Sequence, residues 1–395
     1  MVAEERAVYL DCNATSPLDE SVKQCVMDSL NLWANPSSSS PLGRAAKEAI
    51  EKARLQVATM LGVNNQDVIF TSSGTESNNQ VIHNALILFE ALAREHHCLK
   101  GKLPHVVTSV MDHFSIREPL AALSSRNLVD VSLIPVDSNT GIVSLDELSS
   151  AIRVETCLVT VMLANNETGV VQPLKQISSL VRSKEEEFGH KILVHTDAAQ
   201  AVGKMPVDMC GCDLMTLAGH KFYGPRVGAL ICHPAERITL KPLLYGAPQE
   251  GGRRASTENT PLICGLGQAA QIVIDRLPES SAYLRKIRDY FEQQLKESLG
   301  AKVLINFESS PRLPNTSSVA FPNMQMSSFE LVQKAKSFYA STGAACHSGC
   351  SKASAILLAC GVPEQIAART VRFSVCKLTT KQDIDRVVDE LKTVV

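Results

Sequence analysis

The sequence predicts an α/β protein in which a mainly parallel, doubly wound sheet is covered by helices. Seven short segments are apolar along most of their length, at 67–71, 105–110, 129–136, 157–164, 191–196, 214–218 and 227–233. Strands that are apolar throughout, without alternation, are typical of a sheet that is buried on both faces. Helical stretches separate many of these segments, and strand–helix–strand succession indicates parallel pairing.

Two helical patterns flank the first of these strands. In 43–62 the apolar residues recur at helical spacing, and Gly62 is placed to end that helix. After the strand at 67–71, a second helical pattern passes through Ile82 and Leu86. The later strands then alternate with further helical stretches up to about residue 233.

The chain of 395 residues exceeds one typical single-core domain. The pattern of expected helices and strands changes after about Pro261, where a long charged helical stretch precedes shorter strand-like segments. These later elements are expected at 282–300, 302–307, 317–321, 370–375 and 380–394. We therefore expect a large domain at 16–260 and a smaller α/β domain at 261–395, with residues 1–15 packing on the smaller one.

Composition and charge exclude several classes of protein. Hydrophobic residues make up 45% and charged residues 20%, with a formal net charge of -2, so nothing attracts nucleic acid or an anionic membrane. No apolar run approaches membrane-spanning length. The first residues, MVAEERAVYLDCN, carry acids where a signal peptide needs a basic stretch. These features predict a cytoplasmic protein.

The twelve cysteines predict reduced thiols and no metal centre. Cys157 and Cys232 lie inside apolar runs, where cysteine acts as a small hydrophobic residue. The pairs Cys210/Cys212 and Cys346/Cys350 lack the further partners of a zinc site. A disulfide framework belongs to short secreted chains.

Polar clusters follow five of the expected strands. Ligands bind at the carboxyl ends of parallel strands, so this convergence predicts one site. The clusters are SSGTE, MDH, NNETG, TDAAQ and GHK, at 72–76, 111–113, 165–169, 196–200 and 219–221.

The first cluster opens a helix and offers free backbone amides, hydroxyls and a positive helix end, which suit a phosphate. Taken alone, the same residues are better described as a helix cap, since Ser and Thr are the commonest caps. The cluster lacks the closing Gly-Lys-Ser/Thr of a P-loop, which argues against a nucleoside triphosphate.

Asp197 and Lys221 predict a cofactor. A buried lysine resists remaining an ammonium, and it need not do so if it forms a Schiff base with an aldehyde. Pyridoxal 5'-phosphate has the aldehyde, a phosphate, and a ring nitrogen that a carboxylate such as Asp197 keeps protonated. The alternatives are a helix cap for Asp197, beginning a helix near AAQAVG, and a solvated strand-end lysine.

Five further residues each have a functional and a structural interpretation. His113 stacks on a flat cofactor or closes a loop, and Asn166 and Gln200 bind a ring hydroxyl or phosphate or shape turns. Arg372 binds a substrate carboxylate or a surface carboxylate. Cys346, beside His347 in a run of small residues, is a loop nucleophile or an inert thiol.

The whole chain resembles the class V, fold-type I pyridoxal-phosphate enzymes, the group of cysteine desulfurases and selenocysteine lyases. Ten ordered blocks carry the resemblance: YLDCNATSP, FTSSGTESNN, DHFSI, MLANNETGVVQPL, VHTDAAQAVGK, GHKFYGPRVGAL, RRASTENTP, PNTSSVAF, GAACHS and RFSV. Within this group, three blocks are most similar to the animal selenocysteine lyases. The resemblance implies a large domain with a mainly parallel sheet and a smaller C-terminal domain.

The resemblance also implies residue roles. Lys221 is the Schiff-base lysine, and Cys346 on a mobile loop acts at the chalcogen atom. The resemblance implies that Gly74, Thr75 and His220 bind the cofactor phosphate, and that Arg372 binds the substrate carboxylate. The cofactor ring is contacted by His113, Asn166, Asp197 and Gln200. Thr257 contacts the phosphate bound by the partner subunit. That last contact implies a homodimer.

The implied activity is decomposition of L-selenocysteine to L-alanine, with selenium released as selenide to a reductant or an acceptor protein. The alternative is a cysteine desulfurase that transfers sulfur through a persulfide on Cys346. More distant alternatives are a class V aminotransferase without chalcogen chemistry and a non-catalytic binding protein. Family members usually carry a glycine at Ser256, and the animal lyases an acidic residue at Phe114.

Overall fold

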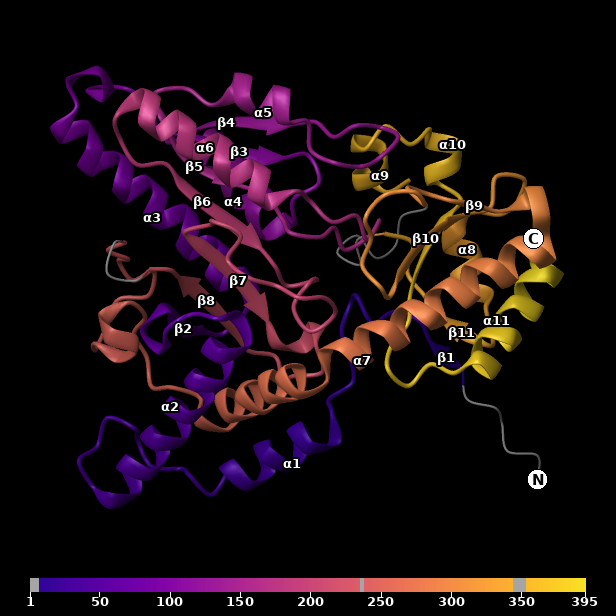
Figure 1. The fold of residues 1–395 in the computed structure, drawn as a ribbon, viewed down its shortest axis with the longest axis horizontal. Helices are drawn as coiled ribbons and strands as arrows, with labels where there is room; N and C mark the ends of the chain where they lie inside the picture. The colour runs from indigo at the N-terminus through magenta and orange to yellow at the C-terminus, as the bar shows by residue number, and fades with distance from the viewer. Residues whose placement is uncertain (1–6, 235–237, 344–352) are drawn as a thin grey trace.

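The computed structural model describes residues 7–234, 238–343 and 353–395. Within these ranges the largest sheet has seven strands in the order β2-β8-β7-β6-β5-β3-β4, seen in the left half of Figure 1. Its strands are β2 Val68–Thr71, β3 His105–Ser109, β4 Asp130–Ile134, β5 Thr156–Thr160, β6 Leu193–Asp197, β7 Leu214–Ala218 and β8 Gly228–Cys232. All seven predicted strands are therefore present, and the predicted fold class is confirmed.

Strand β8 runs antiparallel to both of its neighbours, β2 and β7, while the other pairs are parallel. The connection from β7 to β8 spans only 219–227, and a parallel crossover needs about a dozen residues or more. The other six strands point the same way, and their carboxyl ends share one edge of the sheet.

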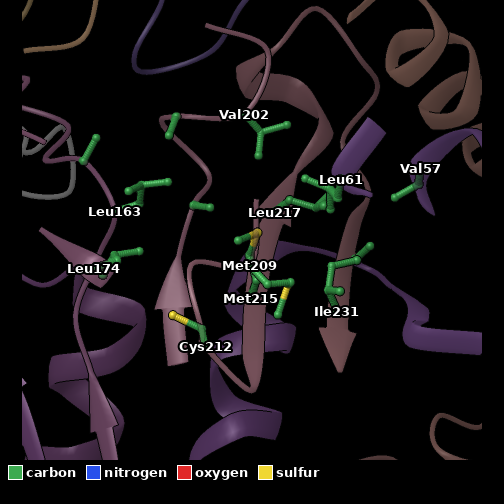
Figure 2. Close-up of a cluster of buried hydrophobic side chains, with 14 of the residues drawn as sticks. Val57, Leu61, Leu163, Leu174, Val202, Met209, Cys212, Met215, Leu217 and Ile231 are labelled. Atoms are coloured by element: carbon green, nitrogen blue, oxygen red, sulfur yellow. The ribbon is translucent and has the colours of Figure 1, made fainter. Parts of the chain in front are cut away.

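Both faces of the sheet are buried at six of its strands, as the apolar segments predict, while the edge strand β4 is partly exposed. Successive residues of one strand enter different cores: Leu193 packs with helices α3 and α4, and Val194 packs with α2, α6 and the first half of α7. Figure 2 shows the second of these cores, where Met215 and Ile231 of the sheet meet Leu61 of α2. The helices of this region are α1 Glu20–Ser29, α2 Pro41–Leu61, α3 Gly74–Glu95, α4 Phe114–Ser124, α5 Leu145–Ala151 and α6 Leu174–Phe188.

The helix predicted over 43–62 is α2. Ser40 caps its first turn by accepting a hydrogen bond from the Gly43 amide, and Pro41 occupies the first position. Gly62 ends it in the left-handed conformation, with φ +67°, where glycine meets no steric penalty.

The helix considered near AAQAVG, after Asp197, is absent. Consecutive hydrogen-bonded turns connect β6 to β7 there, with the amides of Val202 and Met205 bonded to the carbonyls of Ala198 and Ala201. The Asp197 carboxylate accepts a hydrogen bond from the Ala199 amide at 3.0 Å. Asp197 therefore caps a turn, and not the helix that the sequence offered as an alternative.

The C-terminal region has its own core and its own small sheets. The three-stranded sheet has the order β12-β10-β9, and a short parallel pair joins β1 to β11. The elements are β1 Val8–Tyr9, β9 Leu304–Ile305, β10 Thr316–Ala320, β11 Phe338–Tyr339, β12 Thr370–Ser374, α8 Ser328–Lys334, α9 Ala355–Ala359, α10 Glu364–Ala367 and α11 Lys381–Val394. The predicted closing helix is confirmed in α11, whose apolar face is buried.

Helix α7, Thr260–Leu299, runs from the large sheet to the C-terminal region without interruption (Figure 1). Its first half contributes Ile263 and Leu266 to the core beside α2, and its second half contributes Ile287 and Phe291 to the C-terminal core. One helix therefore serves two cores, and the domain boundary at residue 261 stays a prediction.

None of the described helices is both long and apolar enough to cross a membrane. Ten cysteines lie in the described parts of the chain, and all ten are unpaired thiols. Seven of them are buried, Cys25 and Cys210 are half-buried, and Cys98 is exposed. The prediction of reduced thiols is confirmed for these ten.

Strand β6 carries a buried histidine, His195, with its ring nitrogens bonded to the hydroxyls of Thr160 at 2.8 Å and Thr216 at 3.1 Å. Burial lowers the pKa of His195 to about 4. The unfolded chain binds a proton near the ordinary pKa of about 6.5, so this histidine lowers the free energy of unfolding as the pH falls from 6.5 towards 4.

We expect His195→Gln, which keeps polar groups between the threonines, to remove this pH dependence. From pH 7 to pH 5 the wild type should lose about 2 kcal/mol more unfolding free energy than the variant. Urea unfolding at both pH values measures this, with exposed His97→Gln as the control. Equal losses in wild type and His195→Gln would contradict the assignment.

Candidate active site

A cavity of about 300 Å³ lies at the carboxyl edge of the large sheet. It receives side chains from the ends of β3, β5, β6 and β7, from the start of α3 and from β12. Nine residues predicted from the sequence line it: Gly74, Thr75, His113, Asn166, Asp197, Gln200, His220, Lys221 and Arg372. The convergence of strand-end clusters is therefore present in the structure.

Lys221 lies in a single 3₁₀ turn, Gly219–Lys221, directly after β7. Its amine donates hydrogen bonds to two backbone carbonyls of the N-terminal segment, those of Asn13 and Ala14, both at 2.8 Å. Gly219 permits this turn because any larger residue would place its Cβ 2.6 Å from the Pro225 carbonyl oxygen. The lysine is thus fixed at the cavity wall by the backbone.

Asp197 ends β6, the strand next to β7, and only 8% of its surface is exposed. Its carboxylate accepts hydrogen bonds from the Asn78 side-chain amide at 2.8 Å and the Ala199 backbone amide at 3.0 Å. Within the described residues, no ion pair joins this carboxylate to a cationic side chain. A buried carboxylate held only by neutral donors is costly, so Asp197 is ready to receive a positive charge from the cavity.

His113 caps α4 and faces the cavity. The Ser115 amide donates to its Nδ1 at 3.1 Å, so Nδ1 is an acceptor and the ring proton lies on Nε2. Burial, with the charge of Lys221 as a further cause, lowers the pKa of His113 although Asp197 opposes the shift. The ring is neutral at physiological pH, as a stacking partner for a flat cofactor requires.

The start of α3 provides an anion site beside Lys221. Gly74 and Thr75 are its first residues, and Ser73 caps the helix by accepting from the Glu76 amide. The free amides of the first turn and the helix dipole favour a phosphate there. Next to it, burial and then the charge of Lys221 lower the pKa of His220 to about 4, so His220 is neutral.

Gln200 and Asn166 border the cavity, and both also support the N-terminal segment. The Gln200 amide donates to the Asn13 carbonyl at 3.0 Å, and the backbone carbonyl of Asn166 accepts from the Asn13 side chain at 3.1 Å. Gln200 is therefore part of a network with Asn13 as well as a cavity residue.

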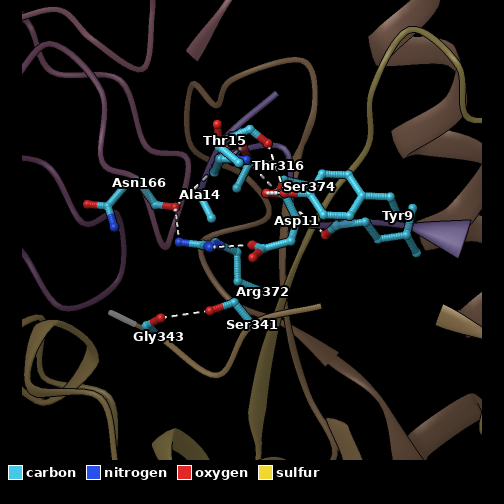
Figure 3. Close-up of polar contacts among 12 residues, drawn as sticks. Tyr9, Asp11, Ala14, Thr15, Asn166, Thr316, Ser341, Gly343, Arg372 and Ser374 are labelled. Atoms are coloured by element: carbon cyan, nitrogen blue, oxygen red, sulfur yellow. Dashed lines mark hydrogen bonds and ion pairs between the residues drawn. The ribbon is translucent and has the colours of Figure 1, made fainter. Parts of the chain in front are cut away.

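Arg372 enters the cavity from β12 of the C-terminal region, and Figure 3 shows its surroundings. Its guanidinium donates to the Asp11 carboxylate at 2.5 Å and to the Asn166 carbonyl at 3.2 Å. Its Nε is buried without a hydrogen-bond partner. An orphaned donor of this kind suits the carboxylate of an incoming ligand, whereas the surface ion pair considered from the sequence does not fit a residue that is 4% exposed.

Two predicted residues lie outside this cavity. Thr257 lines a separate depression of about 220 Å³, beside Ser256, whose φ of +95° is in the region that favours glycine. This conformation gives a physical reason for the glycine that family members usually carry there. Cys346 and its neighbour His347 lie outside the described residues.

Three residues near the site received no role from the sequence. Asn13 contacts both Lys221 and Gln200, Lys204 donates to Asn13 at 3.0 Å, and Asp112 lines the cavity next to His113. Burial, with the nearby charge of Asp197, raises the pKa of Asp112 to about 7. Asp112 follows directly from the strand-end rule, but no local pattern marks Lys204.

An amine and a carboxylate at neighbouring strand ends, beside the open end of a helix, define a site suited to a phosphorylated aldehyde with a basic ring nitrogen. The chain belongs to the aminotransferase class-V family, whose model matches residues 8–387. Membership of this family implies a pyridoxal-phosphate cofactor, and the chain is an enzyme of its cysteine desulfurase and selenocysteine lyase group.

Relatives match this chain over nearly its full length. Selenocysteine lyase of Bos taurus is 42% identical over 99% of this chain and 94% of its own length. Cysteine desulfurase IscS of Methanosarcina thermophila is 38% identical over 99% of this chain and 93% of its own. A solved NifS-like protein superimposes with a TM-score of 0.85 at 30% identity, covering 98% of this chain and 99% of the other.

We expect Asp197→Asn to stabilise the cofactor-free protein by about 1 kcal/mol, because it removes a buried charge. The new amide also gives the buried, unpartnered Asn78 Oδ1 a donor. Affinity for pyridoxal 5'-phosphate should fall at least about tenfold, since the ring nitrogen loses its counter-charge. Thermal melting and absorbance titration measure the two effects.

The exposed Asp275→Asn serves as the matched control and should change neither quantity. If Asp197→Asn bound the cofactor as tightly as the wild type, Asp197 would not carry the counter-charge.

Proposed function

We propose that this protein is a pyridoxal-phosphate-dependent selenocysteine lyase, which converts L-selenocysteine to L-alanine and releases selenium as selenide to a two-electron reductant or to an acceptor. The observation that carries the proposal is the cavity in which Lys221, the unpaired carboxylate of Asp197 and the orphaned Nε of Arg372 converge. The 42% identity to a selenocysteine lyase over nearly the whole chain supports this substrate.

When bound, pyridoxal phosphate supplies an aldehyde for the Lys221 amine and a ring that withdraws electrons from the substrate's α-carbon. Asp197 holds a proton at the ring nitrogen, and the first amides of α3 hold the phosphate. His113 covers the ring, and Gln200 and the Asn166 side chain border it. Each of these groups is placed by a strand end or a helix start, so little reorganisation accompanies binding.

Arg372 binds the substrate carboxylate through the Nε that has no partner within the protein. Asp11 and the Asn166 carbonyl hold the two terminal nitrogens of the guanidinium meanwhile, and Nε is the nitrogen left without an acceptor in the described parts of the chain. The substrate's α-carbon is thereby directed towards Lys221, whose amine removes the α-proton and later returns a proton. Cys346 then assists the departure of selenium, as nucleophile or as proton donor.

The second candidate is a cysteine desulfurase, in which a Cys346 persulfide carries the sulfur. The 38% identity to IscS of Methanosarcina thermophila favours it, and so does the likeness to a structure titled "SspA in complex with cysteine", with a TM-score of 0.77. Both candidates use the same lysine, carboxylate and arginine. The difference is the help given to the leaving atom, since a selenolate leaves more readily than a thiolate.

Comparing the two substrates tests the proposal. We expect purified protein to release selenide from L-selenocysteine at least about tenfold faster than sulfide from L-cysteine. Lys221→Ala should abolish both reactions, with a loss of at least about a thousandfold, because it removes the general base and the nucleophile. Cys346→Ala should lower turnover without removing the cofactor's visible absorbance.

Equal turnover of both amino acids would favour the desulfurase. Transfer of the substrate's amino group without release of selenide or sulfide, unchanged in Cys346→Ala, would favour a class V aminotransferase.

The protein is also proposed to act as a homodimer. Large apolar side chains are exposed along α1, α2 and the segment between them, and these are Met27, Leu30, Trp33, Leu42 and Leu55. Several exposed large apolar side chains on neighbouring elements are typical of an interaction surface. The exposed Thr257, in its separate depression, is then free to contact the phosphate bound by the partner.

We expect the double variant Leu30→Glu, Trp33→Glu to dissociate the dimer, because two charges would be buried at the interface. Sedimentation should give a mass near the 42.8 kDa of one chain, and about twice that for the wild type. Leu378→Glu, at a residue 65% exposed in the C-terminal region, is the control and should stay dimeric. A dimeric double variant would place the interface elsewhere.

A further inference from the structure

Lys204 is a lysine in an unusual position. It lies in the turns after β6 and is only 3% exposed, although an ammonium is costly to bury. Within the described parts of the chain, its hydrogen-bond acceptors are two side-chain amide oxygens, and no carboxylate forms an ion pair with it. A buried lysine bonded to neutral amide oxygens does not stabilise the fold, which points to a role in the neighbouring active site.

The contacts of Lys204 lead to Lys221. Its Nζ donates to Asn13 Oδ1 at 3.0 Å and to Gln200 Oε1 at 2.8 Å. The backbone carbonyl of Asn13 in turn accepts from Gln200 Nε2 at 3.0 Å and from Lys221 Nζ at 2.8 Å. Lys204, Gln200 and Asn13 therefore form a closed hydrogen-bonded ring, and Lys221 is bonded to one of its members.

The charges that face Lys204 are mostly positive. Burial lowers the pKa of Lys204 to about 7; the charge of Lys221 and, more weakly, that of Arg372 act in the same direction, while Cys12 opposes them. Lys204 also contributes to the lowered pKa of His220 on the other side of Lys221. Two amines in one network disfavour each other's protonation.

We propose that Lys204 is a positioning residue of the active site: it fixes Asn13 and Gln200 against the Lys221 amine and, while it is itself protonated, favours the neutral form of that amine. This inference rests on the proposed role of Lys221. The neutral amine is the form that attacks an aldehyde and removes a substrate proton, so Lys204 supports the reaction without touching the substrate.

The test is the pH titration of the visible absorbance band of the holoenzyme, which reports the proton on the Lys221 nitrogen. In Lys204→Met, a side chain of similar length without charge or donors, the midpoint should rise by about one pH unit. That shift is a tenfold gain in proton affinity. Lys204→Gln, which keeps one polar group, should shift the midpoint in the same direction.

Lys175→Met is the matched control, since that lysine is exposed on α6, and its midpoint should equal that of the wild type. A folded Lys204→Met variant with the wild-type midpoint would overturn the inference. Absence of the visible band in the wild type itself would overturn the proposed function instead, so the two failures are distinguishable.

A measurement on the wild type covers the case in which neither variant folds. Competitive acetylation of the cofactor-free protein across a pH series, read by peptide mass spectrometry, gives the protonation midpoint of Lys221. It should lie below the ordinary lysine value of about 10.4. A midpoint at that ordinary value would also overturn the inference.

Discussion

The parallel pairing of β6 with β7 is the constraint on which the rest of the site depends. It places Asp197 opposite Thr216 in the register, so that the carboxylate and Lys221, five residues after Thr216, come to neighbouring ends of one sheet edge. Neutral amides donate to the Asp197 carboxylate, and two backbone carbonyls accept from the Lys221 amine. The sheet thus sets both side chains at the cavity edge with their positions fixed by separate hydrogen-bond partners.

Holding buried polar groups at a cavity costs stability, and the surrounding structure offsets that cost. The two apolar faces of the sheet and the 40-residue helix α7 fix the strand ends, so the polar groups cannot relax towards one another. Arg372 arrives from a different core, and Asp11 holds it there. The buried Nε of Arg372, which has no hydrogen-bond partner among the described residues, belongs to a cavity residue, where ligand binding supplies the missing partner.

The strand ends explain what the sequence could predict. His113, Asp197 and Lys221 each follow an unbroken apolar run, and parallel strands necessarily bring such positions together. The role of Lys204 could not be predicted, because its acceptor on Asn13 lies 191 positions away in the chain. The turns after Asp197 could be mistaken for a helix, because short turns and the first turn of a helix have the same spacing of hydrogen-bonded residues. The antiparallel direction of β8 follows only from the short length of its connection to β7.

The most direct measurement is reduction of the holoenzyme with borohydride, followed by digestion and peptide mass spectrometry. We predict a single pyridoxyl adduct, on the peptide that contains Lys221 and on that lysine. An adduct on another lysine, Lys204 included, or a protein that retains no adduct after reduction, would contradict the assignment of the site.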